Sequence, residues 1–502
     1  MSVTTLDPRP AVRGRSMRPA PRRSAGTSLF LLWLLFAAGS ALTLTMLFVS
    51  VEMRYVLAPL LALAASTAVY AGVLFRRDRQ LPVFEPASLA VAATFVYGAF
   101  PLIGFIAGGL RWHTLTDYRL TLYNPGPREV GTFGWRYALY LAFLVATYLI
   151  VRGRRAVLTT KLNPPGSARV ITIVGLFAFT TIFLLVISFR YGISLSPSYA
   201  DIYSGNAKTA IALPRAVLQF AGNAMAIRLL LEQLFILVLM LHWRFLASRF
   251  VLVAFLAWVA LDNAGGARTE LVLLMMSAVL LYHRLVTPLK LRVLIPAGAL
   301  ILGGFIALGV LRDLGGRGLV EESDTPLLAS SNEFQVIFSN AVDLYYRHHA
   351  GILPPVPWQL YWADLLALVP SQLLPFPKID PSIWYIISLD AQDSNVGLMF
   401  GLLAQAVLGR DWLELALRGI GLGLFLGLLQ RWYVRNHVRF WPTVLIMFLS
   451  VWMFYTVRQS TFFFFYYIVY RFLPTMIATE LLRQVLITPR RIRRAAQRLQ
   501  QA

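Results

Sequence analysis

Long apolar runs recur along the chain from Leu29 to about Leu482, and short polar segments separate most of them. A helix needs about 20 mostly apolar residues to cross ~30 Å of hydrocarbon, and most of the runs approach this length. The runs are continuous rather than alternating, so they predict helices and not the strands of a membrane barrel. The pattern therefore predicts an all-α polytopic integral membrane protein with about twelve transmembrane helices. The predicted spans are approximately 28–50, 55–75, 87–109, 133–151, 170–189, 226–245, 250–263, 270–284, 293–311, 412–430, 440–457 and 461–481.

One hydrophilic interruption, residues 312–411, is much longer than the other connections. Within it, the apolar stretch 396–409 is too short to cross a bilayer, and we expect an interfacial or re-entrant helix at the outer face. A channel or carrier has little use for so long a loop, whereas an enzyme that acts on a lipid-linked substrate at one membrane face does. The predicted segments are a basic tail (1–27), nine spans (28–311), the large extracytoplasmic loop (312–411), three spans (412–482) and a second basic tail (483–502).

The composition agrees with this picture, since 58% of the residues are hydrophobic and only 14% are charged. Soluble domains carry about 25% charged residues. The net charge of +23 would suggest nucleic acid in a soluble protein, but here the basic residues lie in tails and short loops. There they indicate topology and contact with anionic membrane lipid, so we expect no nucleic-acid partner. The absence of cysteine excludes disulfides and thiolate chemistry.

The basic connections alternate along the chain, and placing all of them inside puts both termini in the cytoplasm. The first apolar run, from Leu29 to Val51, is too long for the core of a cleaved signal peptide, so we expect it to be a span. The connections assigned to the cytoplasm are 76–79, 152–169, 244–249, 283–292 and 431–439.

A glycine turn at the predicted outer face leads into the span that begins near Arg268. Gly265 and Gly266 permit a sharp turn. Arg268 and the free backbone N–H groups of the helix start would then suit an anion such as a phosphate. The alternative is a helix-capping turn in which Arg268 pairs with Asp262 or Glu270, and the sequence leaves both open.

The large loop contains a predicted helix over 340–349 that ends in a basic cluster. Asp343 precedes Arg347 by four residues, so an ion pair within the helix is one interpretation. In the other, Arg347 binds a phosphate and His348 or His349 acts as a general base. The chain has no HExxH or similar ligand spacing, and we predict no metal site.

Two more arginines lie in the last part of the chain, Arg458 at the predicted outer face and Arg471 within the last span. A charge at the depth of Arg471 is costly and usually faces a partner or a polar cavity. Several arginines thus converge on one face without an acidic metal cluster. Such a site could hold a diphosphate without a divalent ion and neutralise charge on the leaving group.

Three segments resemble the Wzy-type O-antigen polymerases, also called oligosaccharide repeat unit polymerases. Gly265–Thr269 is similar to the family's Gly-x-Arg segment, and Leu366–Lys378 resembles a Pro- and Lys-containing stretch of its large outer loop. Asn395–Gly423 is similar to its glycine-punctuated region. The order of spans agrees over roughly residues 170–480. Ser371 departs from the pattern, because an arginine is common there.

The resemblance implies a GT-C-like glycosyltransferase of the bacterial inner membrane that needs no metal or other cofactor and inverts the anomeric centre. Its donor and acceptor would be undecaprenyl-diphosphate-linked oligosaccharides, and a chain-length regulator protein would be a partner. On this chain, the arginines expected to bind the diphosphate are Arg268, Arg312, Arg347 and Arg458. The expected base is His348 or His349, with Glu333 and Asp343 as further candidates.

Two other functions compete with a polymerase. An O-antigen ligase would use similar chemistry with a different acceptor, and the sequence barely separates the two. A flippase for polyprenyl-linked glycans would have short loops and charges that line a central cavity, so the long loop argues against it.

Overall fold

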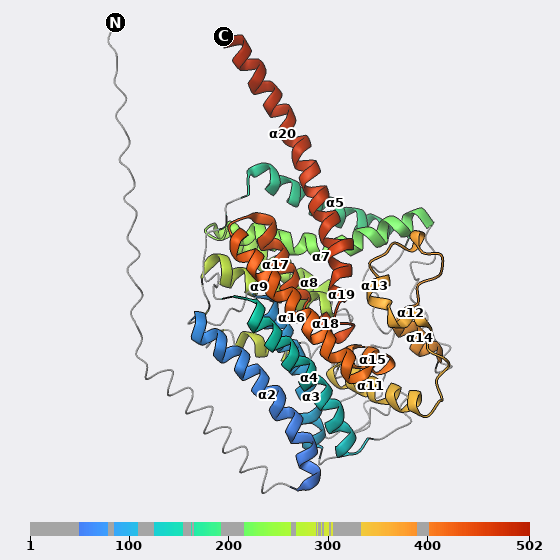
Figure 1. Ribbon diagram of the computed structural model, residues 1–502. Coiled ribbons are helices and arrows are strands. Elements are labelled where there is room, and N and C mark those ends of the chain that lie inside the picture. The colour runs from blue at the N-terminus through green and yellow to red at the C-terminus, as the bar shows by residue number, and fades with distance from the viewer. Residues whose placement is uncertain are drawn as a thin grey trace, which may run out of the picture. The chain divides into compact units, whose positions relative to one another are not determined.

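The computed structural model describes chiefly helices, and within the described ranges it contains no strand (Figure 1). The predicted first span, most of the predicted ninth span and Arg312 lie outside these ranges. The described residues are 50–78, 85–108, 125–153, 162, 165–191, 215–262, 268–287, 289, 293, 296–300, 303–304, 333–388 and 401–501.

Five helices of the described part are long and apolar enough to cross a membrane. They coincide with the predicted spans 55–75, 87–109, 133–151, 170–189 and 412–430, so the chain is an all-α membrane protein. The total of about twelve spans stays a prediction. The five helices are α2 (Val51–Asp78), α3 (Pro86–Ala107), α4 (Pro127–Val151), α5 (Ser167–Tyr191) and α16 (Asp411–Asn436).

The other predicted spans within the described ranges also correspond to helices. These are α7 (Arg215–Leu241), α8 (Leu246–Asp262), α9 (Arg268–Leu281) with the π-helix η2 (Tyr282–Val286), and α17 (Phe440–Trp452). The last predicted span comprises α19 (Phe463–Tyr467), the π-helix η5 (Ile468–Phe472) and the start of α20 (Leu473–Gln501), and α18 (Tyr455–Arg458) precedes it.

The predicted large loop is rich in short helices. They are α11 (Glu333–His349), α12 (Trp358–Tyr361), α13 (Ala363–Leu366), the 3-10 helix η4 (Ser371–Leu373), α14 (Pro381–Ser388) and α15 (Gly401–Leu408). All eight residues of α15 are buried, and at 1.5 Å per residue it is ~12 Å long. This described helix is enclosed by protein and packs against α11 and α16; its predicted place at the outer face stays a prediction.

Helix α4 packs against α2, α3 and α16, which lie beside it in Figure 1. Glycines let α16 approach it closely. A Cβ at Gly419 would lie 2.6 Å from the Tyr140 carbonyl oxygen, and one at Gly423 would lie 2.6 Å from that of Leu144. These glycines are four residues apart and share one face of α16, as small residues do where membrane helices approach closely. The glycine-punctuated region thus has a packing role.

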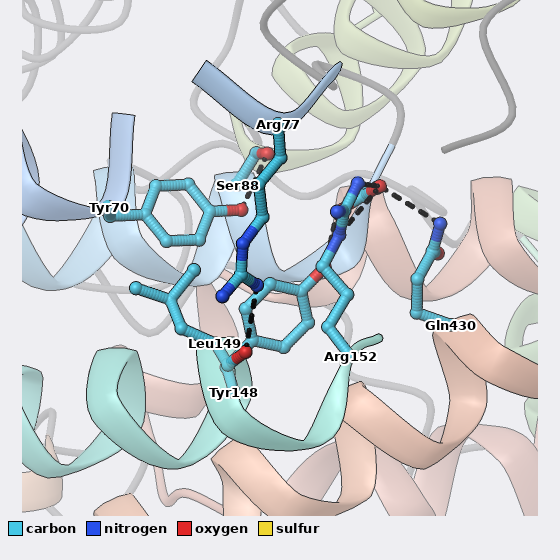
Figure 2. A network of polar contacts seen from close by, with 8 residues as sticks. Tyr70, Arg77, Ser88, Tyr148, Leu149, Arg152 and Gln430 are labelled. Carbon is cyan, nitrogen blue, oxygen red and sulfur yellow. Dashed lines mark hydrogen bonds and ion pairs between the residues drawn. The ribbon is translucent and has the colours of Figure 1, made fainter. Parts of the chain in front are cut away.

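One end of α4 is held by a buried ionic network (Figure 2). Glu85, which precedes α3, accepts hydrogen bonds from Arg152 Nε (2.9 Å) and Nη2 (2.5 Å). Gln430 of α16 donates to the same carboxylate at 2.9 Å, and so does the Tyr148 hydroxyl. Nearby, Arg77 Nη1 donates to the Leu149 carbonyl at 3.0 Å. These contacts therefore connect α2, α3, α4 and α16 at the C-terminal end of α4.

The close approach of α4 and α16 can be tested with two alanine substitutions. Gly423→Ala should destabilise the protein, because its Cβ would overlap the Leu144 carbonyl, and overpacking costs about 1–3 kcal/mol. Gly175→Ala in α5 is the matched control, since nothing lies within 4 Å of its Cβ position. There the better helix propensity of alanine should leave stability equal or higher. The measurement is the melting temperature of the purified protein in detergent, and equal temperatures for both variants would contradict the packing.

Candidate functional site

Helix α11 carries the ion pair that the sequence suggested. Arg347 Nε donates to Asp343 Oδ2 at 2.7 Å, and the Tyr385 hydroxyl of α14 donates to the same oxygen at 2.7 Å. Asp343 is 2% exposed. Burial, followed by the nearby Asp343 carboxylate, raises the pKa of Tyr385 well above its usual value, so its hydroxyl stays a donor. The pair thus anchors the end of α11 to α14, and Arg347 would have to share its guanidinium with any bound phosphate.

The imidazole of His349 has a defined orientation at the end of α11. Its Nδ1 lies 2.8 Å from the Tyr345 carbonyl oxygen, and its ring centroid lies 4.0 Å from the Tyr345 ring. A carbonyl only accepts hydrogen bonds, so Nδ1 carries the proton and Nε2 of the neutral ring is the acceptor. His349 is exposed, whereas His348 is half-buried with its ring centroid 5.8 Å away. Of the two, His349 has the more exposed ring and a hydrogen bond that defines its tautomer.

The other predicted site residues are only partly described. Arg268 is the first residue of α9 and Glu333 the first of α11, but their side chains lie outside what the structure describes. Arg312 lies outside it altogether. Arg458 ends α18, where its Nη1 donates to the Tyr455 hydroxyl at 3.2 Å and its Cζ lies 5.3 Å from the same ring centroid. The structure therefore brings Asp343, Arg347 and the two histidines together and leaves the grouping of the remaining candidates untested.

A buried arginine in the third turn of α4 was not predicted from the sequence. Arg136, 2% exposed, forms a bidentate pair with Asp411 at the start of α16, with distances of 2.7 and 2.5 Å. Its guanidinium lies 4.6 Å from the Trp412 ring centroid and 5.1 Å from that of Tyr345. Asp411 has a φ of 44°, in the left-handed region that few residues other than glycine adopt. Arg136 thus links α4 and α16 to the helix that carries His349.

The carboxylate of Asp364 ties the predicted loop to the helix bundle. Its Oδ2 accepts hydrogen bonds from Arg418 Nη1 at 2.5 Å and Gln405 Nε2 at 3.2 Å. Its other oxygen accepts one from the Ser460 hydroxyl, while Arg418 Nε donates to Glu414 Oε1 at 2.8 Å. One residue of α13 is thereby joined to α15, α16 and the segment after α18. In the sequence, Arg418 inside the predicted span 412–430 indicated a buried charge. The sequence did not show that Asp364 is its partner.

Comparisons of the chain with known protein families, with curated proteins and with solved structures give no match. Within the described residues, no three His, Asp or Glu side chains are grouped as ligands of one metal ion. The basis for a functional proposal is therefore the arrangement of the described residues. It combines a membrane helix bundle, arginine–carboxylate pairs at the start of α16, and an oriented, exposed imidazole on α11.

The Asp364–Arg418 pair should be a large stabilising element. Arg418→Met would leave the Asp364 carboxylate buried without its cation, and removing one member of a buried pair costs about 3–5 kcal/mol. The double variant Asp364→Asn/Arg418→Met should recover much of that loss. Arg483→Met is the control, because its pair with Glu480 is partly exposed and such pairs contribute about 0–1 kcal/mol. The measurement is the melting temperature of each variant in detergent. A double variant no more stable than Arg418→Met would contradict the stabilising role of the pair.

Proposed function

We propose that this protein is a bacterial inner-membrane glycosyltransferase that polymerises undecaprenyl-diphosphate-linked oligosaccharide repeat units at the periplasmic face. The mechanism would be inverting and would need no metal. The observation that carries the proposal is the end of α11, where the exposed His349 is held with Nε2 as its accepting nitrogen. Support also comes from the resemblance of Gly265–Thr269, Leu366–Lys378 and Asn395–Gly423 to the Wzy-type polymerases.

In the proposed reaction, His349 Nε2 takes the proton from a hydroxyl of the acceptor's non-reducing end sugar. The hydroxyl oxygen forms a bond to the anomeric carbon of the donor glycan, and the bond from that carbon to the diphosphate oxygen breaks. Undecaprenyl diphosphate leaves with the electron pair, and attack from the opposite face inverts the anomeric centre. Asp343 is a weaker candidate for the base, because its carboxylate is buried and already accepts bonds from Arg347 and Tyr385.

The diphosphate that leaves would be stabilised by cationic groups, because negative charge grows on it in the transition state. Arg268, Arg312, Arg347 and Arg458 are the proposed ligands on this chain. Arg136 and Arg418 would act as positioning residues, since each is engaged by carboxylates. In this proposal both termini are cytoplasmic, and a chain-length regulator is a possible partner at the periplasmic face.

The test uses the purified full-length chain in detergent, a synthetic undecaprenyl-diphosphate repeat unit, and EDTA. We expect a ladder of products on a gel. Loss of a general base lowers rates by about 10²–10⁴-fold, so His349→Ala should reduce ladder formation by that factor and His348→Ala by much less. Arg347→Ala and Arg268→Ala should also suppress the ladder.

His437→Ala is the matched control, because the His437 Nδ1 also lies close to a backbone carbonyl oxygen (Val434, 2.7 Å), past the last residue of α16. It should leave the ladder unchanged. A full-rate His349→Ala enzyme would remove His349 as the base. Transfer of the glycan only to a lipid A core acceptor would indicate a ligase. Movement of the lipid across liposomes without any ladder would indicate a flippase and end the enzyme proposal.

A further inference from the structure

Arg471 differs in what surrounds it from five buried arginines of the described part of the chain. Its Cζ lies 4.8 Å from the Trp452 ring centroid and 4.5 Å from that of Tyr467. Its Nε is buried without a hydrogen-bond partner, and no carboxylate within the described part of the chain contacts it. The buried arginines with a carboxylate partner are Arg136 (Asp411), Arg152 (Glu85), Arg228 (Glu232), Arg347 (Asp343) and Arg418 (Asp364).

A second donor without an acceptor lies in the same cluster. Trp452 is 2% exposed, and its Nε1 is buried without a hydrogen-bond partner. The Trp452 and Tyr467 rings stack at 4.0 Å between centroids. An unsatisfied buried donor costs about 1–3 kcal/mol, and the cluster contains two of them beside a positive charge. The aromatic faces attract the guanidinium, but they cannot accept bonds as strong as those to an oxygen.

The cluster lies next to the predicted outer loop. Arg471 belongs to η5, and π-helical turns inside α-helices occur often at functional sites. The adjacent Tyr470 donates through its hydroxyl to the Leu368 carbonyl at 3.2 Å, which connects η5 to the segment after α13. On the other side, the Tyr467 and Tyr455 rings lie 5.5 Å apart, and Tyr455 contacts Arg458. Arg458 and Arg471 therefore flank one group of aromatic rings.

We propose that Arg471 and Trp452 form a binding site for a phosphate-type oxyanion carried by a membrane lipid. An oxyanion would accept from the Arg471 Nε and Trp452 Nε1 donors and would also neutralise the guanidinium. A cationic ligand would be repelled by Arg471, and a sugar hydroxyl would leave the charge without a counter-ion. The lipid-linked diphosphate of the proposed reaction and a phospholipid headgroup both carry this chemistry. The assignment of the lipid-linked diphosphate as the ligand rests on the proposed function, whereas the oxyanion site itself does not.

The experiment measures binding without turnover. The full-length protein in neutral detergent is titrated with geranylgeranyl diphosphate and, separately, with phosphatidylglycerol, and bound lipid is counted by native mass spectrometry. Hydrogen bonds to charged groups contribute about 1.5–3 kcal/mol, so Arg471→Met should weaken binding about tenfold or more. Trp452→Phe keeps the ring and removes only the N–H, so it should weaken binding by a smaller factor. Arg471→Lys keeps the charge and should fall between wild type and Arg471→Met.

Arg128→Gln and Trp432→Phe are the matched controls, because Arg128 is exposed in the first turn of α4 and Trp432 is exposed on α16. They should leave affinity for both probes within about twofold of wild type. A loss confined to the diphosphate probe assigns the site to the lipid-linked substrate, and a loss confined to phosphatidylglycerol assigns it to a headgroup. Unchanged affinity for both probes in folded Arg471→Met and Trp452→Phe would overturn the proposal. The proposed polymerase activity has its own test, and it would be contradicted by wild-type protein that makes no ladder.

Discussion

The structure depends on how guanidinium groups are kept inside an apolar helix bundle. A charge there needs a partner, because transfer from water costs several kcal/mol even after relaxation. Helix α4 meets this need twice, with Arg136 paired to Asp411 and Arg152 paired to Glu85. Each pair joins α4 to a residue distant in the chain, so the cost of burying charge also selects one arrangement of the helices.

Glycines and polar pairs make different contributions to the packing of α4 against α16. Gly419 and Gly423 allow the two backbones to approach, which strengthens dispersion contacts but does not by itself set the register. Two polar side chains of α16, Asp411 at its start and Gln430 in its last third, bond to partners that fix the register. Arg418 of the same helix also binds Asp364 of α13, so the helix bundle fixes the position of this part of the predicted loop.

The sequence predicted the parts of this architecture that depend on local pattern. Five spans follow from apolar runs of sufficient length, and the Asp343–Arg347 pair follows from its spacing of four residues. It did not predict pairs between distant residues, such as Arg136 with Asp411, which are 275 positions apart. The same holds for Asp364, whose three partners belong to different elements. Nor could the tautomer of His349 be inferred, since it depends on a hydrogen bond to Tyr345 that requires the helix to be seen.

The two ionic centres on α4 have a mechanical consequence. Arg136 and Arg152 are separated by ~24 Å along the helix at 1.5 Å per residue, and both centres include a residue of α16. A slide of α4 by one helical turn, ~5.4 Å, would break both centres at once and leave the buried Arg136 and Arg152 without their carboxylate partners. We therefore expect helices α4 and α16 to move as one rigid unit. In the proposed reaction, a motion that admits the lipid-linked glycan would therefore have to come from segments outside this helix pair.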